Sequence, residues 1–410
     1  MKSNAAIYYF NPTCELAVAN GSFSFMPPRL LQEMESDLST LPFIFGTEKD
    51  FVLTEFPPSD KFQNTLKNAG FNLPRFCRLT ELEALPVGSF DSIIPWGWSP
   101  AVHFKLKNLK EKCSEEFRKS RVFNWKYEHQ LLYERSTSLD FLYKILNNNP
   151  PKWFIDPTLC GIKVESCVEI EILLKKYSAI VLKAPVSSSG RGIQIIRKSK
   201  LNASNVQWVS GVLKHQKYLI AEPCLNKLLD LSFQFEVQYN SEVLYLGYSI
   251  FETNSNGQYK GTYIRPDFKY LVAENDFTEL LEKIKTTASI LQKALMESEY
   301  AKHYLGYLGV DALIFRHNDT LMIQPCIEVN CRINMGILSL QLENKIHQDA
   351  RGKFEIGLVN SAEFKNNTAM NSEINEIKYR DEKIYSGFKP LVEPDQNKKF
   401  GAYLSLGSAK

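Results

Sequence analysis

The chain has 410 residues, of which 44% are hydrophobic, 12% aromatic and 23% charged. This balance is typical of a soluble globular protein and excludes a disordered or fibrous one, while the length indicates roughly two to four packed subdomains. The formal net charge of +3 is small, so it gives no electrostatic sign of a nucleic-acid or membrane partner. No stretch approaches the ~20 consecutive apolar residues of a membrane span.

The eight cysteines are scattered along the chain and form no C-x-x-C pair. A long chain with unclustered cysteines is typical of a reducing compartment. The N-terminus also lacks the apolar core of a signal peptide. We therefore expect a cytoplasmic protein with free thiols.

The first region, residues 1–115, alternates strand-like with helix-like segments. These segments lie at residues 6–10, 51–53, 61–68 and 92–95. Strands that alternate with helices predict a small α/β domain with a mainly parallel sheet.

The second region, residues 116–220, contains two helix-like segments and two strands. The charged helix covers residues 123–146, the second helix 164–177, and the strands 179–182 and 193–196. The pattern predicts an α+β subdomain.

The third region, residues 221–345, has the clearest periodicity. Alternating residues predict two strand pairs separated by one long amphipathic helix, at 231–239 with 243–251, at 276–299, and at 308–315 with 321–330. The fourth region, 346–410, is polar and ends in two strand-like segments, 384–391 and 400–406.

A loop of small residues follows the buried strand that ends at Lys183. Its small residues are Ser187, Ser188, Ser189, Gly190 and Gly192. Backbone N–H groups and hydroxyls in such a loop can approach phosphate oxygens, while the lysine supplies a point charge. The loop matches neither the P-loop nor the dinucleotide motif, because it precedes a strand. The alternative is an ordinary hairpin with a solvated lysine.

Polar side chains alternate along the last strand pair of the third region. Residues two apart in a strand share a face, so Glu328, Asn330 and Arg332 project together, with Asp311 arriving from the neighbouring strand. Carboxylate and amide oxygens suit Mg²⁺, and the arginine can hold a phosphoryl or carboxylate oxygen. The alternative is a polar sheet face in water, which the flanking apolar residues oppose. Pro325 requires an edge strand or a bulge.

A third motif begins where an apolar strand ends at Glu222. The linker that follows, through Leu225, exposes backbone groups that can read an adenine edge. Asp230, further on, can accept hydrogen bonds from ribose hydroxyls.

The order of these three motifs resembles the ATP-grasp superfamily over roughly residues 120–345. The resemblance implies two subdomains that clamp ATP between their sheets, two Mg²⁺ ions on its phosphates (with Mn²⁺ as a substitute), and a pre-ATP-grasp domain at the N-terminus. Cys331 stands where the family commonly has proline, which removes no ligand. The implied site residues are Lys126, Lys183 and residues 187–192 for the phosphates, Glu222 and Leu225 for adenine, Asp230 for ribose, Asp311, Glu328 and Asn330 for metal, and Arg332 for an acyl phosphate.

The activity implied by this resemblance is ligation of a small-molecule or peptide carboxylate to an amine through an acyl phosphate, with a homodimer as one expected assembly. A phosphotransferase and a non-catalytic nucleotide-binding protein remain as alternatives. Lys260 and Arg265 lie where many members carry a lid, so they are candidate substrate contacts, although loop cations are usually only solvated. Trp96 and Trp98 indicate either a substrate pocket or a packed aromatic corner.

Overall fold

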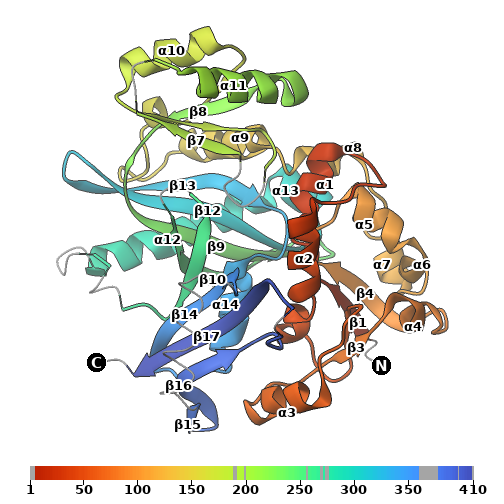
Figure 1. Cartoon of the computed structure of the whole chain (residues 1–410). Coiled ribbons are helices and arrows are strands. Elements are labelled where there is room, and N and C mark those ends of the chain that lie inside the picture. The colour runs from red at the N-terminus through yellow and green to blue at the C-terminus, as the bar shows by residue number, and fades with distance from the viewer. Residues whose placement is uncertain are drawn as a thin grey trace.

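The computed structural model describes residues 5–187, 192–197, 200–254, 257–267, 271–272, 277–359, 377–395 and 397–408. Its described strands form three sheets, and α-helices cover them (Figure 1). No helix in these ranges is long and apolar enough to cross a membrane.

The N-terminal domain is built on a parallel sheet, which confirms the predicted α/β class. Its strand order is β3 (Arg75–Cys77), β2 (Phe51–Leu53), β1 (Ala5–Tyr9) and β4 (Phe90–Pro95). The helices around it are α1 (Cys14–Asn20), α2 (Arg29–Asp37), the 3₁₀ turn Leu41–Ile44, α3 (Asp60–Asn68), α4 (Leu79–Glu83), α5 (Pro100–Lys105), α6 (Lys107–Lys110) and α7 (Glu115–Arg118). The chain runs from β1 outward to β2 and β3 and then crosses back to place β4 on the other side of β1. In α/β sheets, ligands commonly bind at the carboxyl ends of the strands where the strand order reverses in this way.

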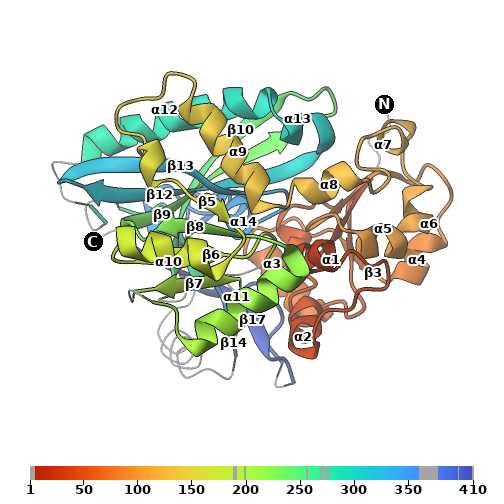
Figure 2. The ribbon, with the colours of Figure 1, turned by 90° about the horizontal axis from the view of Figure 1, so that it is seen from above.

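A small antiparallel sheet follows, in the order β5 (Ile162–Val164), β8 (Leu219–Pro223), β6 (Ile180–Lys183) and β7 (Ile193–Ile196). Helices α10 (Cys167–Lys176) and α11 (Ala203–Gln216) lie side by side over it (Figure 2). The helix predicted over 164–177 is shorter, because residues 162–164 form β5 and the Ser166 hydroxyl caps α10 by accepting the N–H of Glu169.

The large sheet contains nine antiparallel strands. Their order is β13 (Thr320–Asn330), β12 (Gly306–His317), β9 (Asn226–Val237), β10 (Val243–Thr253), β11 (Tyr259–Ile264), β14 (Ala350–Leu358), β17 (Phe400–Ser408), β16 (Lys383–Pro390) and β15 (Lys378–Arg380). The two strand-like segments predicted after residue 346 therefore extend the same sheet that carries the predicted metal ligands.

Two predicted helices are each divided in two. The segment 123–146 forms α8 (Tyr127–Leu131) and α9 (Arg135–Leu146), which begins where the N–H of Arg135 donates to the carbonyl of Pro185. The segment 276–299 forms α12 (Phe277–Met296) and α13 (Glu299–His303), because the Ser298 hydroxyl accepts the N–H of Tyr300 and starts a new helix. The remaining helices are the 3₁₀ turn Pro157–Leu159 and α14 (Met335–Glu343).

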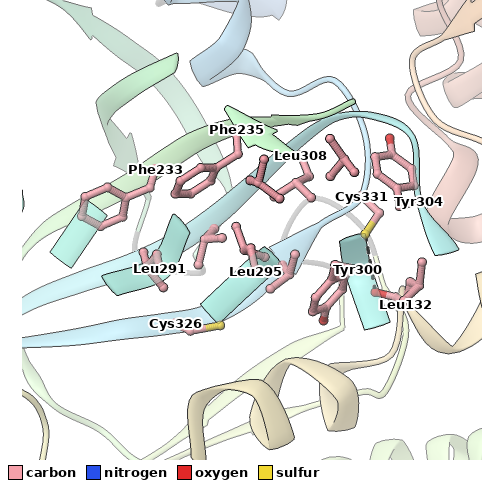
Figure 3. Packing of buried hydrophobic residues seen from close by; sticks show 14 of the residues in the cluster. Leu132, Phe233, Phe235, Leu291, Leu295, Tyr300, Tyr304, Leu308, Cys326 and Cys331 are labelled. Carbon is pink, nitrogen blue, oxygen red and sulfur yellow. Dashed lines mark hydrogen bonds between the residues drawn. The ribbon is translucent and has the colours of Figure 1, made fainter. Parts of the chain in front are cut away.

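The main core lies between α12 and one face of the large sheet (Figure 3). Phe233 and Phe235, two residues apart on β9, point to the same face and pack against Leu291 and Leu295 of α12. A second core joins the N-terminal domain to the end of the chain, and its fully buried members include Phe10, Phe354 and Leu404. These two cores fix the N-terminal sheet beside the large sheet.

Candidate functional site

A cavity of about 650 Å³ opens where the three sheets meet. Pro12, Glu15 and Trp96 line it from the N-terminal domain. The small and large sheets with their adjoining loops, Arg135 at the start of α9 and residues 334–336 at the start of α14 supply the rest of its wall. Its volume is that of a small-molecule or cofactor site.

Two carboxylates stand directly opposite each other on the cavity wall. Asp311 of β12 is the cross-strand partner of Glu328 on β13, and Asn330 on the same face of β13 donates from Nδ2 to Asp311 Oδ2 at 2.9 Å. Burial raises the pKa of Asp311 to about 6, and the nearby charge of Glu328 adds to the shift. Such a pair is stabilised when a cation lies between its members.

The position of Pro325 explains how this strand pair forms. β13 is the edge strand of the large sheet, and its pairing register with β12 shifts between Asp311 and Leu313. Proline lacks the N–H that a central strand would need, so the edge and the bulge together accommodate it, as the sequence predicts.

Arg135, the first residue of α9, faces these carboxylates. Its Nη2 donates to Glu328 Oε2 at 3.0 Å, and its Nη1 donates to Ser187 Oγ at 2.8 Å and to the Ala184 carbonyl at 2.5 Å. Its side chain is only 4% exposed. The sequence reasoning missed this residue, because an arginine at the start of a charged helix carries no mark that separates it from a solvated one.

Lys183 and Glu222 form a buried ion pair across β6 and β8. Glu222 lines the cavity, whereas Lys183 lies behind it. In this structure the lysine therefore holds the carboxylate that the sequence assigns to the adenine end of the site.

Asp230 of β9 lies further along the same wall. Its Oδ2 accepts from Lys227 Nζ at 2.6 Å and from Thr253 Oγ1 at 2.8 Å. Apolar side chains of both sheets flank this part of the cavity, namely Val181, Ile193, Ile195, Leu225, Phe251, Leu313 and Ile327. A flat ring can lie between these side chains, with polar groups at its edge.

Arg332 connects the large sheet to the N-terminal domain. Its Nε donates to Glu15 Oε1 at 2.8 Å, and its Nη2 donates to Asn330 Oδ1 at 3.1 Å. Burial is the largest influence on this guanidinium and lowers its pKa, but the charges of Glu15 and Asp311 and the hydrogen bond to Glu15, acting with the Cys14 thiol, together outweigh burial and raise the pKa, so Arg332 stays cationic. A continuous hydrogen-bonded chain thus runs from Glu15 through Arg332 and Asn330 to Asp311.

No family model matches the sequence. A curated relative, the [butirosin acyl-carrier protein]–L-glutamate ligase of Niallia circulans, is 25% identical over 320 residues, which cover 72% of this chain and 65% of that ligase. The chain thus spans less than two thirds of the relative's length.

Solved structures match almost the whole chain. The biotin carboxylase of Campylobacter jejuni, in a β-γ-ATP complex, superposes with a TM-score of 0.52 at 11% identity and covers 99% of this chain and 88% of its own. An N5-carboxyaminoimidazole ribonucleotide synthetase in an ADP complex gives a TM-score of 0.51 at 11% identity, with 99% and 93% coverage. The chain has the ATP-grasp fold.

The ATP-grasp fold gathers most of the predicted residues around one cavity. Those that line it are Ser187, Glu222, Leu225, Asp230, Asp311, Glu328, Asn330 and Arg332. Ser188, Ser189 and Gly190 lie outside the described residues. Gly192 is needed close to Ser187, because a Cβ at this glycine would lie 2.3 Å from the Ser187 Cβ.

Besides Lys183 and Gly192, three predicted contacts do not line the cavity. Lys126 is exposed beside α8, and Lys260 is exposed on β11. Arg265 instead holds the end of α14, since its terminal nitrogens donate to the carbonyls of Glu343, Ile346 and His347. Its guanidinium satisfies helix-terminal carbonyls there and does not line the cavity.

The two tryptophans differ in their surroundings. Trp96 is 1% exposed, yet one part of it lines the cavity, and its ring contacts Phe10 edge-on. Trp98 packs against the ring of His103 with centroids 4.5 Å apart and does not line the cavity. Trp98 thus belongs to a packed aromatic corner and Trp96 to the cavity wall.

The donor set of the carboxylate pair suits a magnesium ion shared with phosphates. Among the described residues, no group of three His, Cys, Asp or Glu side chains could hold a metal alone. Mg²⁺ is commonly bound by only one or two carboxylates together with substrate phosphates and water. Asp311, Glu328 and the amide of Asn330 meet that requirement.

Proposed function

We propose that this protein is an ATP-dependent ligase that activates a carboxylate as an acyl phosphate and joins it to an amine. The observation that carries the proposal is the opposed pair of Asp311 and Glu328, which stands between Arg135 and Arg332 on the wall of a cavity of nucleotide size. Carboxylates for Mg²⁺ and arginines for phosphoryl oxygens are the groups that phosphoryl transfer requires.

The nucleotide lies along the cavity between the small and large sheets. Its adenine occupies the apolar end beside Leu225, its ribose reaches Asp230, and its phosphates run toward Arg135 and the carboxylate pair. The apolar side chains near Leu225 support this direction, because a base needs apolar contact on its faces, whereas Arg135 and the carboxylate pair offer the cation and the metal ligands that phosphates need.

Asp311, Glu328 and Asn330 would hold magnesium, and we propose two ions with Mn²⁺ as a substitute. When bound, magnesium neutralises charge that develops on the transferring phosphoryl oxygens. If Glu328 served as a metal ligand, the Arg135 guanidinium that now donates to it would be able to donate to phosphate oxygens instead. Lys183 would reach the phosphates only by leaving its ion pair with Glu222, which it forms in this structure.

In the reaction, a carboxylate oxygen attacks the γ-phosphorus, which forms the acyl phosphate and releases ADP. Arg332 steadies this intermediate. The amine loses one proton to solvent and attacks the carbonyl carbon, and the second proton of the nitrogen leaves with the departing phosphate as the amide forms. The two substrates are small molecules, or a small molecule and a carrier protein, because the curated relative's name pairs L-glutamate with an acyl-carrier protein. Residues 1–115, 116–220, 221–345 and 346–410 serve as the pre-ATP-grasp domain, the two ATP-grasp subdomains and the C-terminal extension.

A phosphate-release screen tests this function. The protein would be mixed with Mg-ATP and with pairs of carboxylates and amines, including acyl-carrier-bound acids, and the products would be identified by mass spectrometry. We expect ADP, phosphate and an amide. Asp311→Asn and Glu328→Gln should remain folded and lose release almost completely, whereas normal turnover by either variant would contradict the metal assignment. A stable phosphorylated acceptor would instead identify a phosphotransferase.

A further inference from the structure

Glu15 is a buried carboxylate that only partly uses its hydrogen-bonding capacity. It lies on α1, just after the carboxyl end of β1, and its side chain is 6% exposed while lining the cavity. Oε1 accepts from Arg332 Nε, but Oε2, also buried, has no hydrogen-bond partner among the described residues.

A buried carboxylate oxygen that accepts no hydrogen bond lowers the stability of the folded protein. An ionised carboxyl group offers roughly four lone-pair sites, and buried charged oxygens are normally satisfied by hydrogen bonds. The neighbouring carboxylate Glu35 is a useful contrast, because its Oε1 accepts from both the hydroxyl and the N–H of Thr13 and it does not line the cavity. The missing donor for Glu15 therefore points to a ligand.

The groups around Oε2 favour a ligand that carries a positive charge and donates hydrogen bonds. The charge of Arg332 is already engaged by Oε1 and by Asn330, so an anion placed at Oε2 would meet a negative oxygen with no free cation beside it. An ammonium group supplies up to three donors and the opposite charge. Pro12, Trp96 and Met335 line the adjoining wall and provide apolar and aromatic contact for the carbon skeleton that carries it.

The position also suits the second half of the proposed reaction. Glu15 is joined through Arg332 and Asn330 to Asp311, so it lies at the end of the cavity where the acyl phosphate would form. It comes from the N-terminal domain, which otherwise contributes only a few residues to this wall. We propose that Glu15 forms the amine subsite and binds the ammonium group of a primary amine substrate through Oε2, an inference that rests on the proposed ligase function.

The competing explanation is that Glu15 only positions Arg332. The two roles separate when the nucleophile is changed. Hydroxylamine is uncharged near neutral pH, so it traps an acyl phosphate as a hydroxamate without needing an ammonium site. Loss of an ammonium contact therefore spares hydroxamate formation, whereas misplacement of Arg332 reduces it.

The experiment compares wild type, Glu15→Gln and the control Glu35→Gln, using the carboxylate and amine found in the phosphate-release screen. For Glu15→Gln we expect KM for the amine to rise about 10- to 100-fold, the loss typical of a charged hydrogen bond. Hydroxamate formation and KM for ATP should stay near wild type, and Glu35→Gln should leave all three unchanged.

Two results would overturn the subsite. If Glu15→Gln loses hydroxamate formation and amide formation to the same extent, Glu15 acts by positioning Arg332. If the KM for the amine is unchanged in Glu15→Gln, Glu15 has no role in amine binding. If the wild-type protein yields neither hydroxamate nor amide with any carboxylate, the proposed ligase function fails and the subsite falls with it, a result distinct from the first two.

Discussion

Arg135 and Glu328 are two charged residues that hold each other in position at the cavity wall. Each is held by the other, and the arginine is also anchored by Ser187 and the Ala184 carbonyl. Desolvating both charges is costly, so such a pair adds little net stability, yet removing one partner leaves a buried charge unpaired. A ligand that offers phosphate to the arginine and a cation to the glutamate replaces the pair without that cost.

Arg135→Lys should therefore weaken nucleotide binding while preserving the fold. Lysine keeps the charge but cannot donate in three directions from a planar group. We expect the Kd for Mg-ADP, measured by calorimetry, to rise about 10- to 100-fold. Lys126→Met, at the exposed position outside the cavity, is the control and should leave the Kd unchanged. A larger rise in Kd for Lys126→Met than for Arg135→Lys would instead assign the phosphate contact to Lys126, as the resemblance implies.

His103 gives a pH dependence that is separate from the cavity. It is 5% exposed, and burial, reinforced by the charge of Lys110, lowers its pKa to about 3 from an ordinary value of 6.5. Between pH 6.5 and 3, His103 is therefore protonated in the unfolded chain but neutral in the folded chain. Stability must fall as the pH drops from 6.5 toward 3, by about 1.4 kcal/mol per pH unit for one proton.

His103→Gln should reduce this slope, because glutamine does not titrate. The measurement is the free energy of unfolding in urea between pH 4 and 7.5, where the variant should start less stable and then decline more gently than wild type. His317→Gln, at an exposed position on β12, serves as the control. An identical slope for His103→Gln and wild type would mean that His103 takes up its proton in the folded state.

At the scale of elements, three segments from distant parts of the chain meet beside the cavity. The N–H of Trp96 donates to the carbonyl of Tyr9, and the carbonyl of Trp96 accepts from the N–H of Ile333. Asn11 donates from its side chain to the carbonyl of Gly97 at 2.7 Å. The ends of β1, β4 and β13 are thus tied together, which places Arg332 beside Glu15.

Gly97→Ala should loosen this junction. A Cβ there would lie 2.4 Å from Cys14 Sγ and 3.1 Å from the Arg332 Cβ. We expect a loss of about 1–3 kcal/mol in unfolding free energy, as in other overpacked sites. Gly211→Ala, in the middle of α11 with nothing within 4 Å, is the matched control and should gain about 0.5–1 kcal/mol. Equal effects of the two changes would remove the argument for close packing at Gly97.

The elements that the sequence predicts well are those with strong local periodicity. The strand pair that carries Asp311 and Glu328 was predicted within a few residues, because alternation and flanking apolar residues act locally. β14 and α11 were not predicted, and the break at Ser298 was hidden, since a single capping hydroxyl decides it. Arg135 could not be assigned either, because its partners Ser187 and Glu328 are distant in sequence.

At the scale of the whole molecule, the cavity exists only because three sheets are held together. The core that joins Phe10 to Phe354 and Leu404 and the core between β9 and α12 are both assembled from distant segments. Local patterns contain little information about such packing. The sequence offers Trp96 as one pocket candidate, but the contribution of Pro12 and Glu15 to the cavity wall appears only in three dimensions.

A ligand that bridges these sheets must therefore stabilise the whole molecule. A ligand that binds only the folded state at 100 times its Kd adds about 2.7 kcal/mol to the free energy of unfolding. We expect Mg²⁺ with a non-hydrolysable ATP analogue to raise the Tm, and EDTA to cancel most of the increase, because Asp311 and Glu328 then repel the phosphates. In Asp311→Asn the Tm should no longer depend on Mg²⁺. Some binding of the analogue should persist without the metal, because one of the two carboxylates that repel the phosphates has been removed. A Mg²⁺-dependent increase in this variant equal to that of wild type would place the metal elsewhere.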